Sequence, residues 1–171
     1  MISIVKAVPE DFGLIAEIGK TSFTESHGHS ASPEEISKYI NEKYVNNAVK
    51  AELINTENIY HIIYYNNQPA GYSKINFNEP HSNINEKNIT KLDRLYLLKE
   101  FYDLKLGHEL FKFNIELSKQ NHQKGMWLFV WKENFRAVYF YKKEGFRIIG
   151  SYDFKLSETH SNPNHQMLIV Y

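Results

Sequence analysis

Two short segments of the chain have the residue types of an anion-binding site. Each follows a run of strand-like apolar residues: Leu106-Gly107-His108 comes shortly after Leu95–Leu98, and Asn134 comes shortly after a run that ends at Trp131. A strand end, a short loop and the first turn of a helix bring unpaired backbone N–H groups and the positive end of a helix dipole to one point. Such a point would bind a phosphate or stabilise developing negative charge. Many α/β proteins have this pattern, so alone it identifies no ligand.

The second segment continues into a longer and more specific pattern. It reads Asn134-Phe135-Arg136-Ala137-Val138-Tyr139-Phe140-Tyr141-Lys142-Lys143-Glu144-Gly145-Phe146 and fits Asn-x-x-Ala-x-x-Phe-Tyr-x-x-x-Gly-Phe at every defined position. With this segment the chain resembles the GCN5-related N-acetyltransferases, and the likeness extends over nearly its whole length. Within that family, four segments resemble the bacterial spermidine/spermine acetyltransferases: Ser32–Glu34, Ala70–Lys74, Asp93–Leu97 and Trp127–Trp131.

The resemblance implies acetyl-CoA as co-substrate, no metal, and direct transfer of the acetyl group to a primary amine. Tyr141 matches the position of the acid that protonates the leaving sulfur, and Asp93 lies where many relatives carry a strand carboxylate that acts as a base. The backbone near Leu95 and Leu97 would supply the N–H donor for the oxyanion. The residues expected to hold acetyl-CoA are Leu95, Tyr96, Leu97, Tyr102, Asp103, Leu104, Lys105, Leu106, Gly107, His108, Asn134, Tyr141 and Lys143.

Several of these residues also have an ordinary structural explanation. Asn134 is a suitable N-cap for the helix that follows it, and this role is compatible with binding the pantetheine arm. Tyr141 could pack on the sheet with its hydroxyl in water, and Asp93 could form an ion pair with its neighbour Arg94. Lys143 could be either a ligand of the nucleotide 3′-phosphate or a solvated helix lysine.

The loop expected to bind the pyrophosphate departs from the family pattern Gln/Arg-x-x-Gly-x-Gly/Ala. Here it reads Tyr102-Asp103-Leu104-Lys105-Leu106-Gly107, so that only the last glycine is kept. Lys105 would retain an N–H donor and add a positive charge if its φ is negative, whereas Asp103 is unfavourable beside a pyrophosphate. The sequence therefore predicts that this loop still binds acetyl-CoA, but more weakly than the other motifs suggest.

The acceptor is expected between the first two helices, where this family builds its acceptor pocket. Glu25, His27 and Glu35 are the candidate substrate-binding residues there, and His27 and His29 are alternative bases because histidine titrates near neutral pH. A polyamine would place its cations against acidic side chains, namely Glu25, Glu34, Glu35 and Glu42. An exposed acidic groove would favour a polyamine, and an open cleft along the sheet would favour a peptide or protein amine. An amino sugar or an antibiotic is a further alternative.

The elements that position these residues follow the order β-α-α-β-β-β-α-β-α-β-β. Strands are expected at 2–6, 59–65, 69–77, 90–98, 126–131, 146–151 and 166–170, and helices from Pro9, from Ser32, at 106–120 and at 134–144. Asn66-Asn67 predicts a hairpin turn, and 78–88 predicts a surface loop. On the helix at 106–120, Leu110, Phe113, Ile115 and Leu117 are expected to face inward. The fold class is α/β (α+β): one mixed, mostly antiparallel sheet of about seven strands with helices on both faces.

Length and composition set outer limits. The chain has 171 residues, 42% hydrophobic and 23% charged, which is typical of one folded domain over residues 1–171. Its net charge of +0 argues against nucleic acid as a partner, and no apolar run approaches the roughly 18 residues of a membrane span. The absence of cysteine excludes a thiolate nucleophile and a cysteine zinc site. A cytoplasmic location is expected.

Two functions outside catalysis remain open at this stage. The altered loop at Tyr102 and Lys105 is compatible with a non-catalytic acyl-CoA sensor, although a pure binder needs no acid at Tyr141. A protein of the same shape without cofactor could serve as a structural partner. The aromatic-rich tail from Tyr152 to Tyr171 would permit a homodimer.

Overall fold

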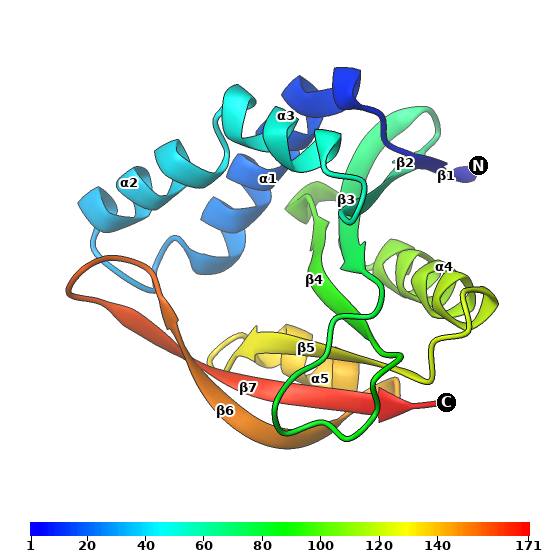
Figure 1. The fold of residues 1–171 in the computed structure, drawn as a ribbon. Coiled ribbons are helices and arrows are strands. Elements are labelled where there is room, and N and C mark those ends of the chain that lie inside the picture. The colour runs from blue at the N-terminus through cyan, green and yellow to red at the C-terminus, as the bar shows by residue number, and fades with distance from the viewer.

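Seven strands form one continuous sheet in the order β1-β2-β3-β4-β5-β7-β6 (Figure 1). The structure is a computed structural model and describes residues 1–171. All neighbouring strands are antiparallel except β4 and β5, so the sheet is mixed and mostly antiparallel, as expected. The strands are β1 Ile2–Lys6, β2 Ile59–Tyr65, β3 Gln68–Asn76, β4 Thr90–Leu97, β5 Gly125–Trp131, β6 Arg147–Lys155 and β7 Ser161–Val170.

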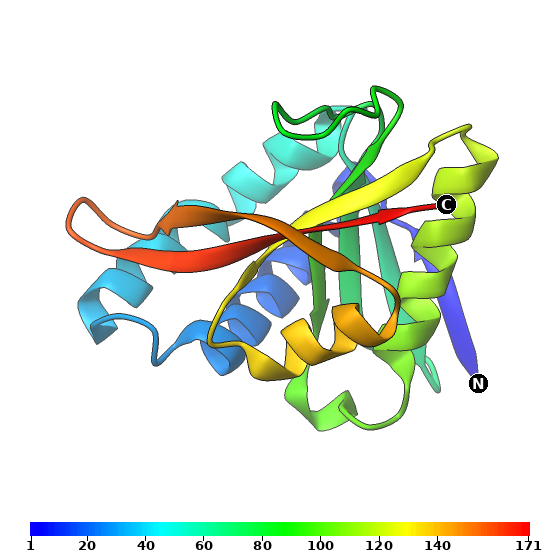
Figure 2. The same ribbon diagram turned by 90° about the horizontal axis from the view of Figure 1, so that it is seen from below.

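Helices cover both faces of this sheet (Figure 2). On one face, α1 and α3 pack on the buried side chains of β2 and β3, and α2 follows α1 towards the β6–β7 hairpin. On the other face, α4 and α5 pack on a core that includes Ile75, Met126 and Met167. The helices are α1 Phe12–His27, α2 Pro33–Lys43, α3 Asn46–Ile54, α4 Leu106–Gln120 and α5 Phe135–Lys143, with short 3-10 turns at Pro9–Asp11 and Lys99–Phe101. None of the helices is long and apolar enough to cross a membrane.

The local signals in the sequence are confirmed where the backbone needs them. Ser32 caps α2, with its hydroxyl accepting from the Glu35 N–H and the Glu35 carboxylate accepting from the Ser32 N–H. Gly145 ends α5 with φ of 97°, the left-handed conformation that glycine adopts without strain. Asn66 and Asn67 both have positive φ and close the β2–β3 hairpin.

Three expectations about the elements need correction. A third helix, α3, lies between α2 and β2; its apolar face is only Val49 and Leu53, too weak a pattern to predict. The last two strands are longer than expected, because they pair with each other over their polar ends as well. On α4, Leu110 and Phe111 are fully buried, while the buried polar residues Asn114 and Ser118 bond to Ser73 and Thr90. Phe113, Ile115 and Leu117 are half-buried: Ile115 and Leu117 pack against the core as expected, and Phe113 packs edge-on against His61.

The feature that creates the site is the separation of β4 from β5. These parallel strands pair at Thr90↔Met126 and Lys91↔Trp127 and no further, so the rest of β4 has no strand partner on that side. A bulge in β4 opposite Lys74 and Ile75 adds to the change of direction. As Figure 2 shows, β4 diverges from β5, β6 and β7, which cross in front of it.

Candidate active site

A cavity of about 1020 Å³ lies where β4 and β5 separate. We describe it in two parts. The cofactor half is formed by Leu95–Leu97, by residues 101–109 other than Leu104, and by residues of 134–144. The acceptor half is formed by Ser22, Phe23, Ser26, His27, Lys91–Arg94, Phe129–Trp131, Tyr152, Phe154, Asn162 and Asn164. All residues expected to hold acetyl-CoA line this one cavity except Leu104, whose exposed side chain lies outside it.

The backbone of β4 is the main wall of the cofactor half. Beyond Lys91 its outer edge has no strand partner, so N–H groups there are available to a bound carbonyl or oxyanion. Two glycines allow the close packing behind it. A Cβ on Gly71 would collide with the carbonyl oxygen of Tyr96, and a Cβ on Gly107 would lie 3.3 Å from the Leu97 side chain. Gly107 thus fixes the first turn of α4 close to the end of β4.

The loop before α4 keeps the backbone shape of a glycine loop without the glycine. Lys105 has φ of 60° and ψ of 10°, and Asp103 has φ of 65°. The negative φ that would have made Lys105 an easy replacement is therefore not present, and a non-glycine residue in this region costs about 1–2 kcal/mol. In return, the first N–H groups of α4 remain free at the cavity, as an anion site requires.

Arg136 is a residue of this site that the sequence pattern did not single out. Its guanidinium lies 4.1 Å from the centre of the Tyr102 ring and donates to Asp103 Oδ1 at 3.2 Å. It thus offsets the unfavourable charge of Asp103 and brings a cation to the position where the family loop has Gln or Arg. It is the second residue of α5 and stands at an undefined position of the motif, which is the reason it was missed.

Asn134 and His108 hold the two helices of the cofactor half in place. Asn134 Oδ1 accepts from the Ala137 N–H at 3.2 Å, so the N-cap is confirmed, and its Nδ2 makes no bond within the chain. His108 Nδ1 lies 2.8 Å from Glu144 Oε1 and links the start of α4 to the end of α5. The exposed Lys143 lies at the rim of the same half.

Tyr141 of α5 is buried, with 8% of its surface exposed, and it lines the cavity from the face of the sheet that α4 and α5 cover. Its hydroxyl has no hydrogen-bond partner within the chain. Burial, and after it the nearby Tyr96, raises the pKa of Tyr141 above its usual value. The phenol therefore stays protonated at neutral pH and can donate that proton.

Asp93 lies on the floor of the acceptor half inside a network of ion pairs. Its carboxylate contacts Lys74 Nζ at 3.1 Å and Lys91 Nζ at 2.9 Å. Burial alone would raise the pKa of Asp93, but the charges of Lys74, Lys91 and Arg94 outweigh it and lower the pKa to about 2. A carboxylate with so low a pKa is a poor proton acceptor from an amine. An ion pair describes Asp93 better than a base does, but its main partners are the two lysines: Arg94 Nε lies 3.9 Å away, and the Arg94 guanidinium pairs with Glu52 instead.

His27 also lies in the acceptor half, between two aromatic rings. It stacks on Phe23 at 4.8 Å and on Trp131 at 5.4 Å, and its Nδ1 is 2.6 Å from the Ser26 hydroxyl. Burial, and then the charge of His29, lowers the pKa of His27 to about 4. The imidazole is therefore uncharged at neutral pH and forms part of an aromatic wall. His29 packs on Trp131 outside the cavity.

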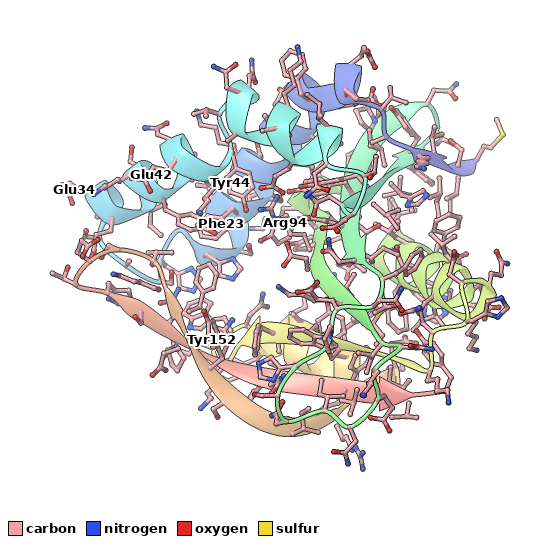
Figure 3. All side chains as sticks on the ribbon, in the orientation of Figure 1. Phe23, Glu34, Glu42, Tyr44, Arg94 and Tyr152 are labelled. Atoms are coloured by element: carbon pink, nitrogen blue, oxygen red, sulfur yellow. The ribbon has the colours of Figure 1, made fainter.

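The carboxylates expected around the acceptor lie elsewhere. Glu25 accepts from the Lys99 N–H at 2.8 Å, and Glu35 is held by Ser32, Ser157 and Thr159; neither lines the cavity. Hydrogen bonds, first from Ser157 and then from Ser32, lower the pKa of Glu35 to about 2. Glu34 and Glu42 are on the exposed side of α2, away from the residues that face the cavity (Figure 3). The structure thus provides no acidic groove.

The far end of the acceptor half is closed. The segment between α1 and α2 is joined to the β6–β7 hairpin by Asn162 Nδ2, which donates to Ser30 Oγ at 2.9 Å, and by the Glu35–Ser157 bond. Leu156 of the hairpin packs in one cluster with Phe23, Ile36 and Tyr39. These contacts bridge the two sides of the cavity at this end. In Figure 3, Phe23 and Arg94 lie on the α1 side of the enclosed space and Tyr152 on the β6 side.

Fold and cavity together define an acyltransferase of the GCN5-related class, and the sequence comparison agrees. Residues 15–146 match the Acetyltransferase (GNAT) family. The chain therefore belongs to this family of acetyl-CoA-dependent N-acetyltransferases.

The individual proteins that the chain resembles share less than a quarter of its residues. Among curated proteins, an "Uncharacterized N-acetyltransferase in pepI 3'region" of Lactobacillus delbrueckii subsp. lactis is 24% identical over 92% of this chain and 91% of its own. Among solved structures, the PaiA N-acetyltransferase of Thermoplasma acidophilum in complex with coenzyme A has a TM-score of 0.79, with 23% identity over 100% of this chain and 99% of that one. The ribosomal-protein-S18-alanine N-acetyltransferase of Escherichia coli has a TM-score of 0.72, with 12% identity over 99% and 94%. At these identities the solved structures support the fold and leave the acceptor open.

Proposed function

We propose that this enzyme transfers the acetyl group directly to the amine of a small molecule bound in the acceptor half. The observation that carries the proposal is the closed end of the cavity, where Ser30–Asn162 and Glu35–Ser157 join α1–α2 to the β6–β7 hairpin. A peptide segment or a protein terminus would have to displace these contacts, whereas a small amine fits the enclosed space. The closed end therefore favours the small-molecule alternative.

The chemistry asks three things of the protein's own residues. The amine must reach the cavity uncharged, and at pH 7 an alkylamine of pKa about 10.4 is neutral only about once in 2,500 molecules. The oxyanion needs N–H donors, for which the free edge of β4 near Leu95 and Leu97 is suited. The leaving thiolate needs a proton, and Tyr141 holds one on a hydroxyl that opens to the cavity. Acetyl-CoA supplies the thioester.

The removal of the amine proton is assigned to water. Both side chains that could act as a base in the acceptor half have lowered pKa values, about 2 for Asp93 and about 4 for His27. At neutral pH the proton affinity of either group is too low for it to be an efficient acceptor of the amine proton. We therefore expect kcat/KM to rise with pH towards the pKa of the amine, without an inflexion near 6.5.

A polyamine is the second candidate. Aromatic faces attract ammonium groups, and Phe129, Trp131 and Tyr152 line this half of the cavity. Against it, the four glutamates expected to receive the cations of spermidine lie outside the cavity, whereas the cations Lys91 and Arg94 line this half of it. A monoamine is therefore favoured over a polyamine.

The proposal is tested with the purified protein and acetyl-CoA. Saturating acetyl-CoA, at 100 times its dissociation constant, is expected to stabilise the fold by about 2.7 kcal/mol, which would raise the melting temperature by roughly 5–10 °C. Release of free thiol is then followed with a panel of small amines, spermidine and a short peptide. Acetylation of small amines in preference to the peptide would support the proposal. No thermal shift at millimolar acetyl-CoA would contradict it.

A further inference from the structure

Four buried side-chain polar atoms of this chain have no hydrogen-bond partner within it. Three of them, His61 Nδ1, the Tyr72 hydroxyl oxygen and Gln166 Nε2, belong to residues that do not line the cavity. The fourth is Oδ1 of Asn164, a residue of the acceptor half. Asn164 is only 8% exposed. A buried acceptor without a donor costs stability, because its hydrogen bonds to water are lost on folding.

The backbone of Asn164 is held in place from both sides. Strand β7 lies between β5 and β6 (Figure 1), and Asn164 is the register partner of Trp131 on β5 and of Tyr152 on β6. A residue in the middle of three paired strands is set by its neighbours, so its side chain has a fixed origin on the cavity wall.

The neighbouring carboxamides on the same face of β7 provide an internal comparison. Asn162 and Gln166 stand two residues to either side of Asn164. Asn162 Oδ1 lies 3.0 Å from His160 Nε2, and Gln166 Oε1 accepts from Asn83 Nδ2 at 2.6 Å. Both of these amide oxygens therefore have a partner within the chain. The oxygen between them is the one left for a donor that a ligand brings.

The wall around Asn164 is otherwise aromatic. The ring of Tyr152 stacks on Phe129 with centroids 4.4 Å apart, and both residues line the cavity. Trp131 lines it on the other side of Asn164. Such rings provide apolar contact and attract ammonium groups, but a ring face is a weak hydrogen-bond acceptor. The carboxamide is thus the buried polar group of an aromatic wall.

We propose that Asn164 is a specificity-determining residue whose Oδ1 accepts a hydrogen bond from an N–H or O–H group of the acceptor molecule. The donor is either the reacting nitrogen itself or a second polar group of the same molecule. An amide oxygen is too weak a base to take the amine proton, so its role is to hold the donor in place. This inference rests on the proposed function and deepens it.

The test compares the wild type with Asn164→Leu and Asn164→Asp. Leucine has a similar size and no hydrogen-bonding group, whereas aspartate keeps an oxygen at the same place and has no N–H. In Asn164→Leu, kcat/KM should fall at least about tenfold, because a hydrogen bond to a charged or polar donor is lost. In Asn164→Asp it should stay within about threefold of the wild type or rise, since a carboxylate also accepts. Equal losses in both variants would assign the role to Nδ2 and overturn the inference.

Three amines of closely similar shape identify the donor. Phenethylamine has only the amine, tyramine adds a ring hydroxyl, and 4-methoxyphenethylamine carries an oxygen there without an O–H. A loss with all three in Asn164→Leu would assign Oδ1 to the reacting nitrogen. A loss confined to tyramine would assign it to the distant hydroxyl. Wild-type kcat/KM with all three in this variant would overturn the inference.

The melting temperature separates recognition from a structural role. Asn164→Leu removes an unpartnered acceptor from an aromatic wall, so the melting temperature without ligand should hold or rise. The thermal shift with acetyl-CoA should stay, since Asn164 is outside the cofactor half. Asn85→Leu, at an exposed asparagine outside the cavity, is the matched control and should leave stability and kcat/KM unchanged. A lower melting temperature in Asn164→Leu alone would mean that the carboxamide supports the fold, contrary to the inference.

Turnover by the wild type distinguishes this inference from the proposed function. Acetylation of small amines with no effect of Asn164→Leu would retain the proposed function and overturn the role of Asn164. If no amine is turned over, the proposed function fails, and the binding of the same three amines in the presence of coenzyme A is compared by thermal shift. Weaker binding to Asn164→Leu would then still support recognition by Oδ1, and equal binding would overturn it.

Discussion

The two halves of the cavity are built in different ways. The cofactor half uses backbone from neighbouring segments: the free edge of β4, the loop at 102–105, and the first turns of α4 and α5. The acceptor half uses side chains from α1, β4, β5, β6 and β7, which meet only in the folded chain. Backbone sites tolerate substitution, which explains how Lys105 can stand in a glycine position. Side-chain sites change with each residue, and acceptor specificity varies there.

The largest expected effect is on kcat, from loss of the Tyr141 hydroxyl. In Tyr141→Phe the proton donor is lost while the ring that packs against Phe146 and Phe140 remains. General acid catalysis contributes about 10²–10⁴-fold, so kcat should fall by about 1,000-fold. The thermal shift with acetyl-CoA should be unchanged. Retention of kcat within about threefold would mean that water, and not Tyr141, protonates the sulfur.

A pH dependence of stability is expected from the acceptor half. The pKa of His27 is about 4 in the native state and near 6.5 in the unfolded chain, so between these values the unfolded chain binds more protons. Unfolding free energy should therefore be flat above pH 6.5 and fall by about 2 kcal/mol on going to pH 4, allowing for partial exposure of the ring. His61 also has a pKa of about 4, lowered by burial first, and contributes in the same direction.

The contribution of His27 is isolated by comparison with His27→Phe. This variant keeps the stack between Phe23 and Trp131 and removes the titrating group, while Ser26 keeps its bond to the Ser22 carbonyl. The difference in unfolding free energy between wild type and variant should change between pH 6.5 and pH 4, as measured by urea denaturation. A constant difference over this range would show that His27 is not held uncharged.

Acetyl-CoA binding in the cofactor half should be sensitive to Arg136 and insensitive to Lys142, a lysine of α5 outside the cavity. Arg136→Ala removes the cation that stacks on Tyr102 and pairs with Asp103, leaving that carboxylate beside the phosphate site. The dissociation constant for acetyl-CoA should rise about tenfold. Lys142→Ala, an exposed lysine outside the cavity, is the matched control. The dissociation constants are measured by calorimetric titration. An equal increase in both variants would show that Arg136 contributes only through the general surface charge.

The same difference between the halves explains what the sequence could predict. Caps, turns and the motif from Asn134 to Phe146 are local, and they correctly predicted the strands and most helices; the residues they single out for the cofactor, apart from Leu104, line one cavity. The acceptor residues depend on tertiary contacts: Glu35 meets Ser157, 122 positions along the chain, and this contact takes it out of the site. The helix α3 was missed because packing against α1 stabilises it more than its own pattern does.

The smallest expected effect tests whether the loop works through its backbone. Lys105 is left-handed, so Lys105→Gly relieves strain and should stabilise the fold by about 0.5–1 kcal/mol after the greater entropy of glycine in the unfolded chain is subtracted. Lys105→Ala removes the same charge and keeps the strain, so it serves as the matched control. If N–H groups bind the pyrophosphate, both variants should retain the dissociation constant for acetyl-CoA within about threefold. A loss of about tenfold in both would instead assign the binding to the Lys105 ammonium, and the cofactor half would then depend on side chains as the acceptor half does.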